Sequence, residues 1–264
     1  MIIGIAIALS TNCSFSSAQV VLLDYYFNHE AHHNKSGEPE RFHYMWEDRE
    51  NTGFSILGNA FVKNGATLRS LDVPPGAGNL KSADIYIIVD PDTKKETADP
   101  HYITEKDVQE IVKWVKGGGV LVMFANDSAN VELTHYNHLA ARFGMHFNDD
   151  LQNHVIDDAH FDEGGVSTIN NPAFKNARLV FMKDVCSIDV KNPANAFLRN
   201  KNNAVIIAIA KIGKGTVMAV GDPWLYNEYT NGRLPVKFEN DKAADDITRW
   251  LISQIPSKNR SHLN

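Results

Sequence analysis

Short apolar runs alternate along this chain with stretches in which apolar residues recur every three or four positions. The short runs predict buried strands at residues 20–23, 67–71, 85–89 and 120–124. The longer spacing predicts helices at residues 54–63, 104–117 and 131–143. This alternation is typical of βαβ units, so we expect an α/β fold with a doubly wound, mostly parallel sheet.

The rhythm changes after residue 144. Residues 145–200 contain short strand-like pieces between turns rich in Asn, Asp and Gly, which predicts a β-rich insertion within the same domain. Regular elements return further on, as a hairpin of two strands and a last helix, at residues 204–210, 216–220 and 243–252. One domain is therefore expected over residues 19–255, followed by a flexible tail at 256–264.

The first 18 residues have the pattern of a signal peptide. Residues 2–9 are apolar but too few to span a bilayer, and Ser16, Ser17 and Ala18 are the small residues that a signal peptidase requires. We expect cleavage after Ala18 and an exported, periplasmic protein. Two alternatives stay open, namely a lipid anchor through Cys13 and a first buried strand.

Composition narrows the class of partner. The chain has 264 residues, 43% of them hydrophobic, and a formal net charge of −6. This charge argues against nucleic acid and against insertion into or binding to an anionic membrane, so an acidic substrate would need a few well-placed donors. The two cysteines, Cys13 and Cys186, provide no disulfide framework.

Polar side chains follow four of the predicted strands. They lie at Asp24-Tyr25-Tyr26, Asp90-Pro91-Asp92, Asn126-Asp127-Ser128 and Asp222-Pro223-Trp224. The carboxyl ends of parallel strands share one edge of a sheet, so these groups are expected to converge on one crevice. The alternative is that Asp, Asn and Pro merely form turns and helix caps there.

A long segment, residues 28–51, separates the first strand from the first helix. It is rich in histidine and aromatic residues, and we expect it to form a lid or wall over the strand ends. Trp46 and Trp224 are candidates for stacking on sugar rings, and Arg41 is a candidate for holding a carboxylate. Equally, Phe42, Tyr44 and Trp46 could form a local hydrophobic anchor.

Several familiar kinds of active site are disfavoured. The segment His29-Glu30-Ala31-His32-His33 fits the zinc-protease pattern, but it follows a strand and runs into Asn34-Lys35-Ser36-Gly37, whereas that motif requires a helix. Asn126 stands where an amidotransferase would carry its cysteine nucleophile, and no serine elbow or dinucleotide-binding glycine motif is present. We expect no metal and no cofactor.

Five segments resemble the glutamine-amidotransferase-like domain family associated with unsaturated uronyl hydrolases. They are residues 22–28 (LLDYYFN), 42–48 (FHYMWED), 85–92 (IYIIVDPD), 118–122 (GGVLV) and 221–228 (GDPWLYNE). The resemblance implies a flavodoxin-like or class I glutamine-amidotransferase-like fold. It also implies an oligosaccharide dehydratase of ulvan breakdown, which converts a terminal uronic acid into the 4,5-unsaturated uronate that the partner hydrolases consume.

Such an elimination needs a base for the C5 proton, an acid for the departing O4 and donors to the substrate carboxylate. His43 and Tyr226 are the candidates for base and acid, in either order, and Asp222 could orient a histidine or bind a hydroxyl. The candidate substrate-binding residues are Tyr25, Arg41, Trp46, Glu47, Asp90, Asn126, Asp127 and Trp224. Arg41 and Asn126 are expected to form the carboxylate clamp.

Two alternatives from other classes remain. The first is a non-catalytic carbohydrate-binding accessory domain, which would need aromatic and carboxylate side chains but no acid and base. The second is a glycoside hydrolase that uses Asp90 and Asp222 as its two carboxylates.

Overall fold

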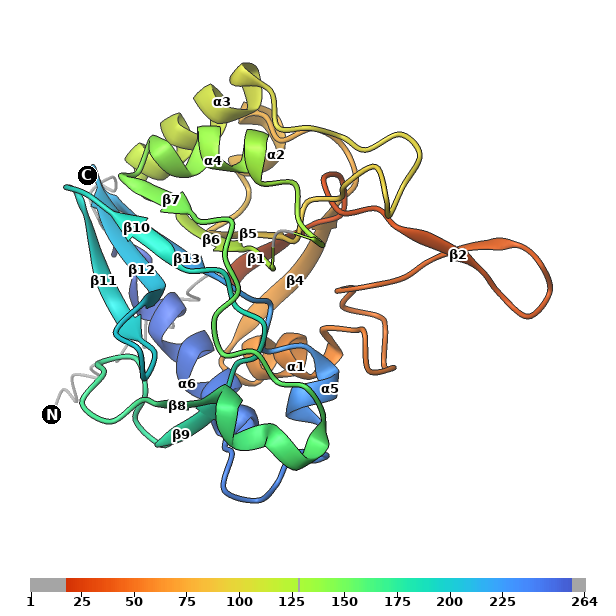
Figure 1. The fold of residues 1–264 in the computed structure, drawn as a ribbon. Helices are drawn as coiled ribbons and strands as arrows, with labels where there is room; N and C mark the ends of the chain where they lie inside the picture. The colour runs from red at the N-terminus through yellow and green to blue at the C-terminus, as the bar shows by residue number, and fades with distance from the viewer. Residues whose placement is uncertain (1–17, 128, 258–264) are drawn as a thin grey trace, which may run out of the picture.

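A computed structural model of the chain describes residues 18–127 and 129–257. The predicted signal peptide, apart from Ala18, and the predicted tail beyond Ser257 lie outside these residues. Elements are labelled as in Figure 1.

A seven-stranded sheet forms the centre of the fold, in the order β11-β12-β13-β6-β5-β1-β4 (Figure 1). Its strands are β1 (Gln19–Asp24), β4 (Ala66–Leu71), β5 (Ile85–Val89), β6 (Val120–Phe124), β11 (Ala194–Arg199), β12 (Val205–Ile212) and β13 (Gly215–Val220). Five neighbouring strands, from β4 to β13, are parallel, and β12 and β11 complete the sheet in antiparallel pairings. The predicted mostly parallel α/β sheet is confirmed, and so is the hairpin of β12 and β13.

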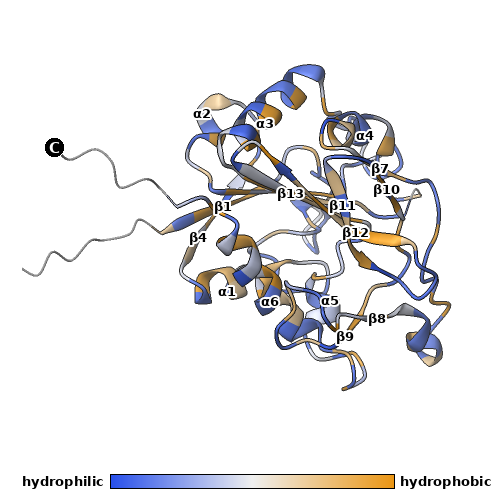
Figure 2. Cartoon of the chain, turned by 90° about the vertical axis from the view of Figure 1, so that its left-hand side faces the viewer, coloured by the Kyte–Doolittle hydropathy of each residue, from blue (hydrophilic) through white to orange (hydrophobic). Residues whose placement is uncertain are grey.

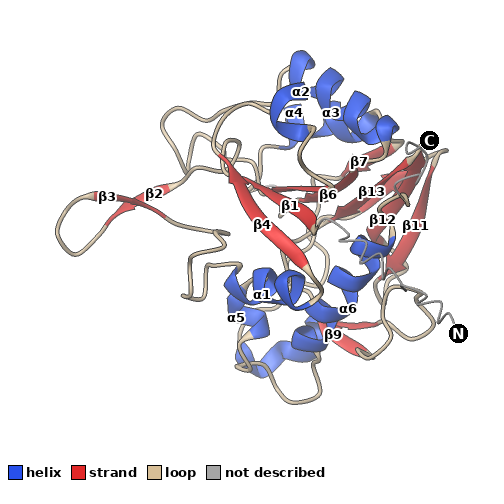
Figure 3. Ribbon diagram, turned by 180° about the vertical axis from the view of Figure 1, so that it is seen from behind, coloured by secondary structure: helices blue, strands red, loops and turns tan. Residues whose placement is uncertain are grey.

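Helices cover both faces of this sheet (Figure 3). On one side lie α1 (Ser55–Lys63), α5 (Asn227–Thr230) and α6 (Asn240–Ser253), and on the other lie α2 (Ala77–Leu80), α3 (Glu105–Gly117) and α4 (Leu133–Ala141). The alternation of side chains along each strand feeds two cores. Val21 and Leu23 face the core on the side of α1 and α6, and Leu22 faces the core on the side of α3 and α4. Figure 2 shows the apolar strands between the two helical layers.

Local sequence signals account for the best-defined helix. Thr104 accepts a hydrogen bond from the Asp107 backbone N–H while the Asp107 carboxylate accepts one from the Thr104 N–H, so α3 begins with a capping box. The helix ends at Gly117, and Gly118 adopts a φ of 125°, which a glycine tolerates. Both ends were predicted, because the signals are local.

Residues 145–200 form short pieces of structure. The strand β7 (Met145–Phe147) pairs with β10 (Ile188–Val190), and β8 (Gly165–Ser167) pairs with β9 (Leu179–Phe181) after the 3₁₀ helix η1 (Asp158–Gly164). The last strand of the segment, β11, is an edge strand of the central sheet rather than part of a separate layer.

A two-stranded hairpin projects from the body of the protein (Figures 1 and 3). Its strands are β2 (Ala31–His33) and β3 (Pro39–Arg41), and nearly all of their residues are exposed. We call residues 29–43 the arm. The sequence predicted a lid or wall without regular structure in this segment. In the structure, part of the segment forms a hairpin.

Candidate functional site

The four predicted strand ends lie on one edge of the sheet. Asp24 ends β1 and Asp90 directly follows β5, while Asn126 and Asp222 each come two residues after their strands, β6 and β13. These strands are consecutive neighbours in the order β13-β6-β5-β1, and their last residues are in register, with Val89 paired to Phe124 and Phe124 to Val220. The predicted convergence of the strand ends is therefore confirmed at the level of the backbone.

Asp90 is a buried carboxyl in the middle of this edge. Its backbone φ is 47°, and its Oδ2 accepts hydrogen bonds from the Tyr44 hydroxyl (3.0 Å) and from Asn126 Nδ2 (3.1 Å). A left-handed backbone is costly outside glycine and is concentrated at functional sites. Burial raises the pKa of Asp90 well above its ordinary value, so this carboxyl holds its proton more readily than an exposed one.

Asp222 is a second carboxyl with a raised pKa at this edge. It is buried, and burial, followed by the negative charge of Asp90, raises its pKa well above the ordinary value. Because β6 lies between β5 and β13, the strands that precede Asp90 and Asp222 are two strand spacings apart, which is about 10 Å.

Buried polar atoms without a protein hydrogen-bond partner gather at the same edge. Within the two described ranges they include atoms of Asn28, Arg41, Asp90, Asp92 and Asp222. Nearly all buried polar groups in proteins are hydrogen-bonded, so a cluster of exceptions needs an explanation. A polar ligand at these strand ends provides one.

His43 lies at the root of the arm, beside this edge. Its Nδ1 is 2.7 Å from Oε1 of Glu30, which is itself buried, and its side chain is 28% exposed. A carboxylate on Nδ1 favours the tautomer that carries a proton there and leaves Nε2 free to accept one. His43 and Tyr44 both have positive φ values, 69° and 52°, so the chain turns sharply here.

Tyr44 connects His43 to Tyr226. The centre of its ring is 5.4 Å from that of His43 and 6.1 Å from that of Tyr226. The Tyr226 hydroxyl donates to Glu228 Oε2 at 3.2 Å, and burial raises the pKa of this tyrosine far above its ordinary value. The two residues predicted as acid and base therefore share one neighbour.

Arg41 and Tyr25 form a separate cluster nearer to β1. The Arg41 guanidinium lies 3.8 Å above the Tyr25 ring and donates to the Asn28 carbonyl oxygen. The Tyr25 hydroxyl in turn donates to Glu47 Oε2 at 2.8 Å. Arg41 and Asn126 thus contact different groups, and the structure gives the predicted carboxylate clamp no common partner.

Three predicted binding residues have structural roles instead. Trp46 is 8% exposed and Trp224 1% exposed, and both belong to the core on the α1 and α6 side. The Asp127 carboxylate accepts hydrogen bonds from the Ala129 N–H and from Asn130 Nδ2, as a turn-capping residue does. The prediction that the two tryptophans stack on sugar rings is wrong for this conformation, because neither ring is accessible.

The sequence analysis placed Asp92 among the polar strand ends but not among the site residues, gave Glu30 no role in the site, and treated Tyr44 only as part of an anchor. Glu30 lies inside the segment that fits the zinc-protease pattern. The structure places this segment on β2 and the two residues before it, not on a helix. Among residues 18–127 and 129–257, no group of three or more His, Cys, Asp or Glu side chains is arranged to hold a metal ion. Cys186 is buried in the core, and burial raises the pKa of its thiol.

Asp92 lies behind the arm. It is buried, and its Oδ2 accepts the His29 backbone N–H at 2.8 Å. The His29 ring stacks on His101 at 4.2 Å, and His101 stacks on Tyr26 at 4.0 Å. Asp92 thus holds the first residue of the arm, and the stacked rings pack beside it.

Replacing Asp92 should reveal the cost of burying it. Burial raises the pKa of Asp92 from 3.8 to about 7. Between these two pH values the carboxyl of Asp92 is protonated in the folded state but ionised in the unfolded chain. Wild-type stability therefore falls as pH rises through this window. We expect Asp92→Asn to gain stability on the order of 3 kcal/mol at pH 8 and little at pH 4, measured by chemical unfolding. Asp127→Asn, at a solvent-accessible turn, is the control, and equal gains at both pH values would contradict the prediction.

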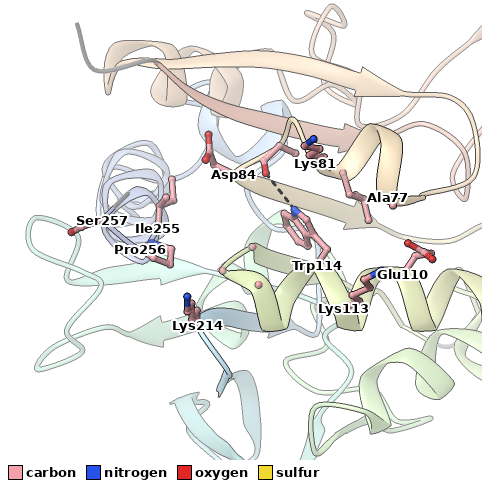
Figure 4. A pocket seen from close by; sticks show the side chains of 15 residues that line it. Ala77, Lys81, Asp84, Glu110, Lys113, Trp114, Lys214, Ile255, Pro256 and Ser257 are labelled. Carbon is pink, nitrogen blue, oxygen red and sulfur yellow. Dashed lines mark hydrogen bonds between the residues drawn. The ribbon is translucent and has the colours of Figure 1, made fainter. Parts of the chain in front are cut away.

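A hollow lies beside α3, where β5 and β6 begin (Figure 4). It has a volume of about 680 Å³ and is lined by Trp114 and the end of α3, with Lys81, Lys113 and Lys214 around it. None of the strand-end residues described above lines it. It is therefore separate from the candidate site.

No helix in the part of the chain that the structure describes is long and apolar enough to cross a membrane.

Comparison with known proteins gives a likeness of fold. No family model and no curated protein sequence matches the chain. Among solved structures, the mmIFT52 N-terminal domain matches with a TM-score of 0.63 and 17% identity over 93% of this chain and 100% of that one. Cytoplasmic protein STM1381 from Salmonella typhimurium LT2 matches with a TM-score of 0.57 and 12% identity over 90% and 100%. The exo-beta-1,4-mannosidase Op5Man5 from Opitutaceae bacterium strain TAV5 matches with a TM-score of 0.50 and 12% identity over 91% of this chain but only 37% of that one. At these identities the chain is similar to all three in fold alone.

Proposed function

We propose that this protein is a carbohydrate-active lyase that removes water from a uronic acid at the non-reducing end of an ulvan-type oligosaccharide. The observation that carries the proposal is the pair of His43 and Glu30, 2.7 Å apart, at the edge where Asp90 and Asp222 are buried. A base oriented by a carboxylate and a nearby acid that keeps its proton are the groups that an elimination requires.

In this proposal His43 Nε2 takes the C5 proton of the uronate. The electron pair of the C5–H bond forms the C4=C5 double bond, and the C4–O4 bond breaks. O4 receives a proton from the acid and leaves as water. Proton transfer is most effective when the pKa of the acid lies near the working pH, which favours Asp222 over Tyr226 as the donor because burial raises the tyrosine pKa far above neutrality.

The substrate carboxylate gains charge as the C5–H bond breaks. A protonated Asp90 can donate a hydrogen bond to it, as a neutral carboxylic acid does in an oxyanion hole. Arg41 contributes positive charge from the side of β1, although burial lowers its pKa and its Nη2 is already bonded to Asn28. The raised pKa values of Asp90 and Asp222 also reduce the repulsion that an acidic site would otherwise exert on an acidic substrate.

The test is direct. Purified protein is incubated with oligosaccharides that end in a saturated uronic acid, and the near-ultraviolet absorbance of a new conjugated enoate is followed. Oligosaccharides that end in the corresponding neutral sugar are the control, since they lack the carboxylate that acidifies C5. We expect absorbance to rise only with the acidic substrate. A flat signal, with no dehydrated product by mass spectrometry, would overturn the proposal.

A non-catalytic carbohydrate-binding domain is the second candidate. The observation that favours it is Asn126, which follows β6 where an amidotransferase has its nucleophile and here donates its side-chain amide to Asp90. Such a domain would bind the acidic oligosaccharide without changing it. Saturable binding with no enoate formed over long incubation would support this candidate over the lyase.

The wider setting belongs to the same proposal. We infer membership of the amidotransferase-like family, with its flavodoxin-like sheet and β-rich insertion at residues 145–200. We also infer an exported, periplasmic protein whose product passes to unsaturated uronyl hydrolases. Fractionation of the producing cells would test the location, because recovery only from the cytoplasm would contradict export.

A further inference from the structure

The arm carries an aromatic surface that the proposed chemistry does not use. Phe42, at its root, is half-buried and belongs to neither main core cluster. Its ring centre is 4.0 Å from that of His43 on one side and 4.7 Å from that of His32 on the other. His32, on β2, is exposed. We call His32 and Phe42 the arm platform.

The arm platform is continuous with the candidate site. Ring contacts run from His32 through Phe42, His43 and Tyr44 to Tyr226. At one end of this series Tyr44 is buried and Tyr226 is partly buried, whereas at the other end His32 is exposed on the projecting hairpin (Figure 3). A chain of sugars whose terminal unit occupies the strand-end site would extend along the exposed part.

Stacking on the arm platform matches the chemistry of a pyranose ring. One face of such a ring presents C–H groups, which pack on an aromatic ring, and its hydroxyls remain free to form hydrogen bonds at the rim. Glu40 is paired directly with His32 across the hairpin and supplies an exposed acceptor beside it. His32 is exposed and Phe42 half-buried, whereas Trp46 and Trp224 are both in the core.

We propose that the arm platform binds the second sugar unit of the oligosaccharide, next to the terminal unit held at the strand ends. This inference rests on the proposed carbohydrate substrate. It implies that His32 and Phe42 make the protein bind longer oligosaccharides more tightly than shorter ones. The arm platform acts on affinity and takes no part in the proton transfers.

The experiment measures binding instead of turnover. Dissociation constants for a monosaccharide uronate and for the disaccharide and trisaccharide that end in it are obtained by calorimetry. The Asp222→Asn background is used, because it lacks the proposed acid but keeps the His43 ring that contacts Phe42. An aromatic contact is worth about 0.5–1.5 kcal/mol, so His32→Ala should weaken binding of the two longer ligands roughly two- to tenfold. The affinity for the monosaccharide should not change, because that ligand does not reach the arm.

His33→Ala is the matched control. His33 is an exposed histidine on the same strand, it projects to the opposite face of the hairpin, and within the described ranges its ring stacks on no other. It should leave all affinities unchanged. Phe42→Ala should repeat the effect of His32→Ala, and Phe42→Trp should retain binding. Equal effects of His32→Ala and His33→Ala, or an equal loss for the monosaccharide, would overturn the inference.

The two proposals fail separately. If the wild-type protein forms no enoate but binds longer chains more tightly through His32, the lyase is wrong and the arm platform stands. If the protein forms enoate and every arm variant binds all lengths as the parent does, the arm platform is wrong and the lyase stands.

Discussion

His43→Ala is expected to lower the turnover of an acidic oligosaccharide by about 10²–10⁴-fold, the range that general acid–base groups contribute. The reason is that His43 is the basic side chain whose orientation is set by a buried carboxylate, Glu30, at 2.7 Å. Loss of the imidazole removes the acceptor for the C5 proton. The measurement is the initial rate of enoate formation under saturating substrate, together with KM.

Glu30→Gln tests the contribution of the Glu30 carboxylate while the His43 imidazole is kept. An amide in place of the carboxylate no longer holds the imidazole in the proposed tautomer, so kcat should fall about tenfold or more. His33→Ala is the control for disturbing the arm. If His43→Ala retains a near wild-type rate on a substrate that the parent dehydrates, the base has to be sought elsewhere, and Asp90, Asp222 and Tyr25 are the remaining candidates.

The central sheet could be predicted because its signals are local. The apolar run at β5 lies between Asp84 and Asp90, and the run at β6 lies between Gly119 and Ala125-Asn126. The structure begins and ends both strands at the predicted positions. The topology then follows from general rules for parallel sheets, which bring the strand ends to one edge. The sequence therefore located the edge that carries Asp90 and Asp222 without any knowledge of contacts.

The pairing of side chains at this edge could not be predicted, because it depends on the path of the arm. Glu30 and His43 are 13 residues apart and meet because the hairpin of β2 and β3 returns the chain to its starting point. Tyr44 reaches Asp90 from 46 residues away. Such contacts depend on positive φ values at His43 and Tyr44, where no glycine marks the turn.

Tryptophan shows a second limit. Trp224 follows a polar strand end and Trp46 lies in the aromatic segment 28–51, and these positions suggested a sugar-binding role. The fold directs both rings into the core, where Trp46 lies 6.2 Å from Phe54 and Trp224 lies 6.2 Å from Phe174, measured between ring centres. Position along the chain gives the edge on which a residue starts, but not the side of the sheet to which a loop side chain turns.

Trp224→Ala should accordingly unfold the protein more easily and should not act as a binding variant. The side chain is 1% exposed, and removing a buried tryptophan costs about 3–5 kcal/mol through lost burial and the cavity that remains. Urea unfolding followed by circular dichroism measures this loss. Trp250→Ala is the control, since Trp250 is only partly buried at the end of α6 and should cost less. Without urea, at a temperature at which Trp224→Ala is still folded, the affinity of this variant for the oligosaccharide should match that of the parent. A variant of unchanged stability that loses this affinity would restore Trp224 as a sugar-stacking residue, and would mean that the loop after β13 adopts another conformation when ligand binds.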